Sequence, residues 1–111
     1  MDKDSEQLLS QAQLYQHQIQ SVMTQKTALS MELNEIDKAL EEIESSKEKS
    51  VLKISGPILL KMEAKDIKKE LNEKKETIAL RLKTMEKQEK SLKDKIEELR
   101  EKVMKSQPKA G

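Results

Sequence analysis

The sequence predicts a mainly α-helical chain, folded as an antiparallel two-helix coiled-coil hairpin with one short β-hairpin at the bend. Three observations lead to this fold class. Apolar residues recur in heptads along two arms of similar length, the helix-breaking residues are confined to two places, and the two halves carry opposite net charge. With 111 residues, 39% of them charged and one aromatic, the chain also lacks the apolar material for an ordinary globular core.

The first arm is expected to be helical over residues 5–46. Positions spaced alternately four and three apart form a stripe in which ten of eleven residues are apolar, although the whole chain is only 34% apolar. Such a stripe is typical of a coiled-coil seam, the line along which two helices pack. Its members are Leu8, Ala12, Tyr15, Ile19, Val22, Lys26, Leu29, Leu33, Ile36, Leu40 and Ile43.

The second arm, expected to be helical over residues 64–106, repeats the pattern. Its stripe consists of Ile78, Leu82, Met85, Glu89, Leu92, Ile96, Leu99 and Val103, and Ile67 and Leu71 extend it upstream through a four-four step. Residues 1–60 hold 6 basic and 10 acidic groups, a net charge of −4, whereas residues 61–111 hold 16 basic and 11 acidic groups, a net charge of +5. Because opposite charges attract, the arms are expected to pair with each other.

Lys26 and Glu89 are the charged members of the two long stripes, and antiparallel pairing places them about one helical turn apart. One interpretation is an ion pair that fixes the register of the helices. The favoured interpretation is that both side chains extend separately to water along their aliphatic stems.

The bend, residues 50–62, is predicted to form a β-hairpin. Gly56 and Pro57 give a strong turn signal between two segments rich in aliphatic residues. The hairpin residues are Val51, Leu52, Ile54, Gly56, Pro57, Ile58, Leu59, Leu60 and Met62. Apolar side chains fall on both faces, and a two-stranded hairpin is marginal alone in water, so strands from other chains are expected to complete a shared sheet or barrel. The alternative is a hairpin that folds back onto its own coil.

With this hairpin between its two heptad arms, the sequence resembles prefoldin, and specifically its β class. Residues 52–61 match the family hairpin, in which a hydrophobic residue and Lys precede Gly and an aliphatic run ending in Lys follows it. Weaker similarity lies at residues 15–18, 34–35, 39–42 and 87–89. The space between Ile43 and Ile67 accommodates one β-hairpin, as in the β class, rather than the two of the α class.

The resemblance implies a single prefoldin-like domain over residues 1–111, with a flexible tail at residues 107–111. It also implies an α2β4 heterohexamer with α-class subunits, built on a β-barrel platform in the cytoplasm. Such an assembly is an ATP-independent co-chaperone (a holdase) that binds unfolded client polypeptides at its coiled-coil tips and delivers them to a group II chaperonin. The tip residues here are Leu8, Leu9, Ala12, Leu99, Val103 and Met104. Flexible apolar groups suit irregular partners, although four of the six also suit an ordinary seam.

Other functions are less compatible with the sequence. The carboxylates lie on predicted solvated helix faces, and His17 has no Cys or second His beside it, so neither catalysis nor a metal or other cofactor is expected. No apolar run is long enough to span a membrane, and the basic second half lacks aromatic residues that would stack on nucleic-acid bases. A structural coiled-coil scaffold or tether without client binding is the main alternative; it explains the heptads but not the hairpin.

Overall fold

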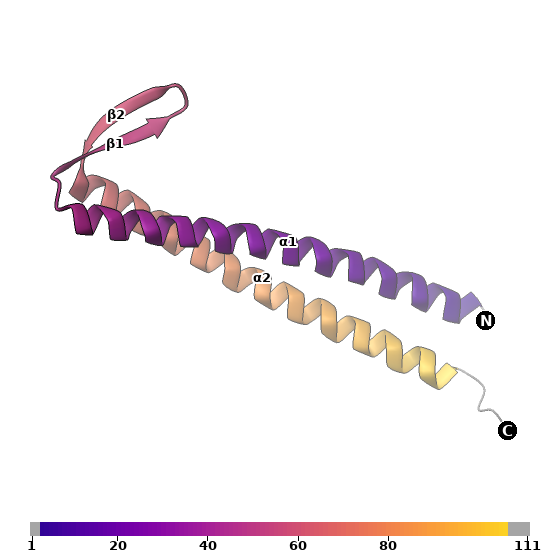
Figure 1. Ribbon diagram of the computed structural model, residues 1–111. Coiled ribbons are helices and arrows are strands. Elements are labelled where there is room, and N and C mark those ends of the chain that lie inside the picture. Colours follow the sequence, from indigo (N-terminus) through magenta and orange to yellow (C-terminus); the bar gives the residue numbers. More distant parts are fainter. Residues whose placement is uncertain (1–2, 107–111) are drawn as a thin grey trace. The chain divides into compact units, whose positions relative to one another are not determined.

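The computed structural model describes residues 3–106; the predicted tail at residues 107–111 lies outside this range. Its elements in chain order are α1 (Lys3–Ser46), β1 (Ser50–Ser55), β2 (Ile58–Glu63) and α2 (Ala64–Ser106), as Figure 1 shows. The helices are 44 and 43 residues long, and the strands pair as one antiparallel hairpin. The mainly α fold class with two long helices and one β-hairpin is confirmed.

The chain divides into two compact units. Within the described range, unit 1 combines residues 3–27 of α1 with residues 83–106 of α2, and unit 2 is the continuous segment 28–82, which contains the β-hairpin. In each unit a segment of α1 packs against an antiparallel segment of α2 through apolar side chains. The buried apolar residues are Ile19, Met85 and Leu99 in unit 1 and Leu29, Ile36, Ala64, Ile67 and Ile78 in unit 2.

The heptad stripes locate these seams. Every stripe position predicted from the sequence is buried or half-buried, including the charged members Lys26 and Glu89. Ion pairs also join the helices across the seam of unit 2: Lys74 lies 3.5 Å from Glu32, Lys75 lies 2.7 Å from Asp37, and Lys68 pairs with Glu44. In all three pairs α1 supplies the acid and α2 the base, as the opposite net charges of the two halves predict.

The connection from α1 to β1 is short. α1 ends at Ser46, and Lys47 adopts a left-handed backbone conformation with φ 55°. A residue in this conformation commonly follows the last residue of a helix, because it turns the chain away from the helix axis. The backbone N–H of Ala64 donates to the carbonyl of Lys49 at 2.7 Å, so the ladder continues one pair beyond the hairpin and joins its base to the start of α2.

The hairpin turn consists of Gly56 and Pro57, between the paired residues Ser55 and Ile58. Gly56 has φ 58°, which strains residues with a Cβ, and Pro57 fixes its own φ near −65°. Positive φ at the first position of a two-residue loop is the pattern of a type II′ turn, whose twist suits a β-hairpin. A Cβ built at Gly56 meets no other atom within 4 Å, so glycine is favoured here by backbone conformation rather than by space.

Candidate functional site

The β-hairpin of unit 2 exposes most of its aliphatic side chains. Its exposed large apolar residues are Leu52, Ile54, Ile58, Leu59 and Leu60, whereas Val51 and Met62 are half-buried, and Gly56 and Pro57 form the exposed turn. Within residues 3–106 the sheet has these two strands alone. The hairpin therefore offers a large apolar surface that its own unit does not cover, which is unusual for an isolated soluble chain.

The register divides the hairpin into two faces, because directly paired residues of an antiparallel ladder lie on the same face. The inner face carries the pairs Val51–Met62, Lys53–Leu60 and Ser55–Ile58. It is partly covered, since Val51, Lys53 and Met62 are half-buried and the Lys53 ammonium lies 2.6 Å from the carboxylate of Glu70 on α2. This ion pair shows which face of the hairpin is turned toward the helix.

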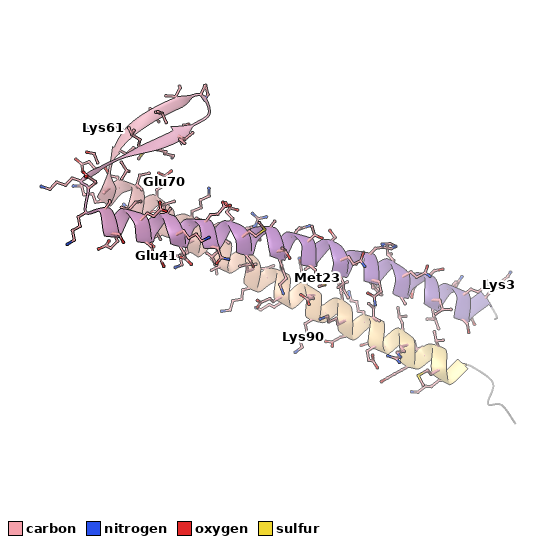
Figure 2. The ribbon with its side chains drawn as sticks, in the orientation of Figure 1. Lys3, Met23, Glu41, Lys61, Glu70 and Lys90 are labelled. Atoms are coloured by element: carbon pink, nitrogen blue, oxygen red, sulfur yellow. The ribbon has the colours of Figure 1, made fainter. Side chains whose placement is uncertain are left out.

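The outer face carries Leu52, Ile54 and Leu59 together with Lys61, which is labelled on β2 in Figure 2. The exposed fractions of the three aliphatic residues are 66%, 76% and 62%, respectively. Burying these side chains would provide a considerable driving force, at about 25 cal/mol per Å² of apolar area. The outer face is therefore the stronger candidate for contact with other chains.

The two edges of the hairpin are also available for pairing. The Ala64–Lys49 hydrogen bond marks a hydrogen-bonded pair, and such pairs alternate with non-hydrogen-bonded pairs along an antiparallel ladder. The non-hydrogen-bonded pairs are consequently Ser50–Glu63, Leu52–Lys61 and Ile54–Leu59. Backbone groups of these residues point away from the partner strand, so the outer-face residues also carry the edge donors and acceptors that a further strand would use.

The six predicted tip residues lie in unit 1, near the start of α1 and the end of α2, but they do not form one exposed patch. Leu99 is buried, and Leu8, Ala12 and Val103 are half-buried in the seam. Leu9 and Met104 lie outside it, with exposed fractions of 37% and 66%. Four of the six residues thus hold the helix ends together, and the other two present apolar surface to solvent.

Lys26 and Glu89 form an ion pair in unit 1, with the Lys26 ammonium donating a hydrogen bond to Glu89 Oε2 at 2.9 Å. The favoured sequence interpretation, that the two side chains extend separately to water, is wrong. The other Glu89 oxygen lies 2.9 Å from Lys93 Nζ one turn along α2, so both oxygens face an ammonium group. In this pair α1 supplies the base and α2 the acid, the reverse of the three ion pairs across the seam of unit 2. The pair provides charge complementarity in an apolar seam, where a shift of one heptad would leave both groups facing aliphatic residues.

The pKa values of the pair are shifted in opposite directions. Hydrogen bonds from Lys26 and then Lys93 lower the pKa of Glu89, and the hydrogen bond to Glu89 raises the pKa of Lys26. A lowered carboxyl pKa contributes stability above the unfolded-state pKa, and this contribution is lost as pH falls through the folded-state pKa. The raised Lys26 pKa contributes below its unfolded-state value, and that contribution is lost as pH rises through the folded-state pKa.

Replacing Glu89 by Gln is therefore expected to have a pH-dependent effect. At neutral pH the Glu89→Gln chain should unfold at a lower temperature than the parent, because Lys26 loses its charged partner in a partly covered seam. The difference should shrink as pH falls below about 4.3, the ordinary pKa of Glu, and through the lowered folded-state pKa, where the parent carboxylate also becomes protonated. Thermal unfolding followed by circular dichroism from pH 2.5 to 7 measures it. Glu101→Gln, at an exposed position of the same helix, is the control; an equal deficit at pH 3 and pH 7 would contradict the assignment.

The described part of the chain contains neither a metal-binding cluster nor a membrane-spanning helix. Among residues 3–106, no three His, Asp or Glu side chains are grouped so that they could hold a metal ion. His17 lies exposed on α1. None of the helices described has the length and apolar character needed to cross a membrane.

Unit 1 also contains a long uncharged segment that the sequence predictions did not single out. The α1 segment from Gln7 to Gln25 contains no Asp, Glu, Lys or Arg, although such residues make up 39% of the chain. The signal that would have revealed it is a local charge count along each arm, because the net charge of the whole half conceals it.

Comparison with known proteins agrees with this architecture. The family model described as "Prefoldin subunit" matches residues 6–110. A prefoldin subunit beta from Thermococcus onnurineus is 42% identical over 106 residues, covering 94% of this chain and 91% of that protein. Another from Archaeoglobus fulgidus is 39% identical over 97 residues, covering 86% of this chain and 84% of that protein.

The solved structures include a similar chain. The crystal structure of the prefoldin beta subunit from Thermococcus strain KS-1 superposes with a TM-score of 0.87 at 36% sequence identity, covering 96% of each chain. Sequence and structure therefore agree over nearly the full length, including the β-hairpin. On this evidence, the chain belongs to the prefoldin family of chaperone subunits, in its β class.

Proposed function

We propose that this chain acts as the β subunit of an α2β4 heterohexamer in the cytoplasm. In this assembly it works without ATP as a holdase, capturing unfolded polypeptides at the coiled-coil tips and delivering them to a group II chaperonin. The observation that carries the proposal is the outer face of the hairpin, where Leu52, Ile54 and Leu59 are exposed beside unpaired strand edges. A scaffold or tether would need the heptads but has no use for this surface.

Assembly through the hairpin is supported by two of its features, the edge backbone groups that a further strand could pair with and the exposed apolar side chains that it could bury. A neighbouring strand from an α-class subunit would satisfy the edge backbone groups and bury the outer-face side chains at the same time. The partly covered inner face, held toward α2 by the Lys53–Glu70 ion pair, leaves the outer face in position to receive that strand.

Client capture at the helix ends is supported by Leu9 and Met104. Both are exposed apolar residues in unit 1, and the unbranched Met104 side chain adapts to irregular surfaces. Leu8, Ala12, Leu99 and Val103 would contribute when the last turns of the helices separate, because helix ends are the least stable part of a coiled coil.

Truncation tests client capture. Removing residues 1–10 and 104–111 is expected to abolish suppression of client aggregation by the hexamer, because it removes Leu8, Leu9 and Met104 together. Light scattering by a denatured client at stoichiometric hexamer measures the activity, and analytical ultracentrifugation verifies that the hexamer is intact. A chain lacking only residues 107–111 is the matched control. Full holdase activity of an intact truncated hexamer would rule out the tips as the capture site.

A further inference from the structure

The α1 segment of unit 1 differs from every other part of the chain in its charge. From Gln7 to Gln25 it carries seven Gln residues and no charged side chain. The α2 segment beside it, residues 83–106, is densely charged. An exposed helix in water gains solubility from charged residues, and the rest of this chain uses them freely. A neutral segment of five helical turns therefore needs an explanation other than solubility.

A shallow groove follows the seam within this unit. It has a volume of about 420 Å³ and no acidic residue in its lining. The lining residues are Gln18, Ser21 and Val22 from α1 and Gln88, Ser91, Leu92 and Lys95 from α2. Val22 and Leu92 are seam residues that remain half-buried, so the floor of the groove is aliphatic and its walls are mostly neutral hydrogen-bonding groups.

The face of α1 that lines the groove can be followed toward the start of the helix. Residues seven apart lie on the same face of a coiled-coil helix, which aligns Leu14 with Ser21 and Gln11 with Gln18. Leu14 has an exposed fraction of 55% although it is aliphatic. We call this surface the neutral face: Gln11, Leu14, Gln18, Ser21 and Val22. It combines uncharged amide and hydroxyl groups with accessible aliphatic side chains.

This combination fits one type of occupant, an extended stretch of unfolded polypeptide. Such a stretch presents unpaired backbone N–H and C=O groups together with apolar side chains. A Gln amide both donates and accepts hydrogen bonds, so it can pair with either backbone group. Neutral amides also lose less than charged groups when water is removed from them, and they neither repel nor select a client by its charge. A folded partner with a fixed charge pattern would instead favour complementary charges.

We propose that the neutral face extends the client-binding tip inward along α1 and holds an extended, uncharged segment of a non-native polypeptide that the tip has captured, with aliphatic client side chains in the groove. This inference rests on the proposed holdase function and deepens it. Away from the tip, the neutral residues of α1 then make the main contact with the client, with Leu92 of α2 at the floor of the groove, while the charged residues of α2 keep the unit soluble.

Leu14→Glu in the assembled hexamer tests the proposal. Binding of reduced, carboxymethylated α-lactalbumin, a permanently unfolded probe, is measured by fluorescence anisotropy. Kd is expected to rise about five- to tenfold, as the loss of roughly half of one leucine's burial predicts. Met31→Glu is the matched control, because Met31 is an exposed apolar residue of the same helix, 60% exposed, outside the neutral segment. Its Kd should stay at the parental value.

A second measurement does not depend on a destabilising substitution. A photo-crosslinking amino acid placed at Gln18 should capture the probe, whereas one placed at Lys90 on α2, labelled in Figure 2, should not.

The outcomes separate this inference from the proposed function. If Leu14→Glu leaves Kd unchanged and no probe is crosslinked at position 18, while the tip truncation abolishes binding, the neutral face is not a client surface, although the proposed function stands. If the truncation also has no effect, both proposals fail. If Leu14→Glu blocks hexamer formation, the face is a contact between subunits and the inference is overturned.

Discussion

Substituting Leu52 and Ile54 by Asp is expected to prevent assembly with α-class subunits while leaving the helices intact. Both side chains stand on the outer face with exposed fractions of 66% and 76%, so the unassembled chain tolerates a carboxylate there. In a shared sheet the same carboxylates would be buried without partners, at a cost of several kcal/mol each. Apolar contact would also be lost, so the expected effect is loss of the hexamer rather than a modest weakening.

The measurement is light scattering coupled to size exclusion, on the variant mixed with an α-class subunit. Circular dichroism of the variant alone should match the parent. Leu80→Asp supplies the control, because Leu80 lies on α2 at 68% exposure and differs from Leu52 mainly in its location. If the double variant still formed a hexamer of normal mass, the outer face would not be the assembly surface and a scaffold function would gain support.

The second large effect is expected at Ile78 in the seam of unit 2. With an exposed fraction of 3%, it is the most completely buried apolar residue described in the chain. Truncating a buried isoleucine to alanine removes apolar contact and leaves a cavity, which costs about 2–5 kcal/mol in protein cores. A two-helix seam has few other contacts over which to spread that loss, so Ile78→Ala should lower the free energy of unfolding by an amount in this range.

Chemical unfolding followed by the helical circular dichroism signal measures the effect. Leu80→Ala, two residues further along α2, removes a similar side chain from an exposed position and should change the free energy of unfolding by less than about 0.5 kcal/mol. Equal losses for the two variants would show that the seam of unit 2 is not centred on Ile78. The heptad assignment of α2 would then have to be revised.

Much of the fold follows from local or periodic features of the sequence. The four-three spacing identifies a seam position from its own neighbours, and every member from Leu8 to Ile43 is indeed covered. Gly56 and Pro57 fix the turn because their backbone preferences act within one or two residues. The main error concerned Lys26 and Glu89, since the spacing placed both in the seam but could not say whether they meet.

For the candidate sites too, the sequence predicts which residues are involved, whereas contacts between distant residues decide which of them are exposed. The sequence identified the hairpin residues and showed that both faces are apolar, because side chains alternate along any strand. Which face is covered depended on the Lys53–Glu70 contact between the hairpin and α2. By contrast, the heptad stripe already included Leu8 and left out Leu9, and the structure agrees, because Leu8 is half-buried in the seam and Leu9 lies outside it.

The sequence by itself determined the two long helices, the residues along their seams, the position and single-hairpin character of the bend, and the family resemblance. These features depend on helical periodicity and turn chemistry, which act over a few residues. Tertiary structure decided the Lys26–Glu89 pairing, the free outer face of the hairpin, and the alignment of neutral side chains beside a groove. Each of these depends on how residues distant in sequence are brought together, and a shift of one helical turn would change all such contacts without altering the periodic pattern.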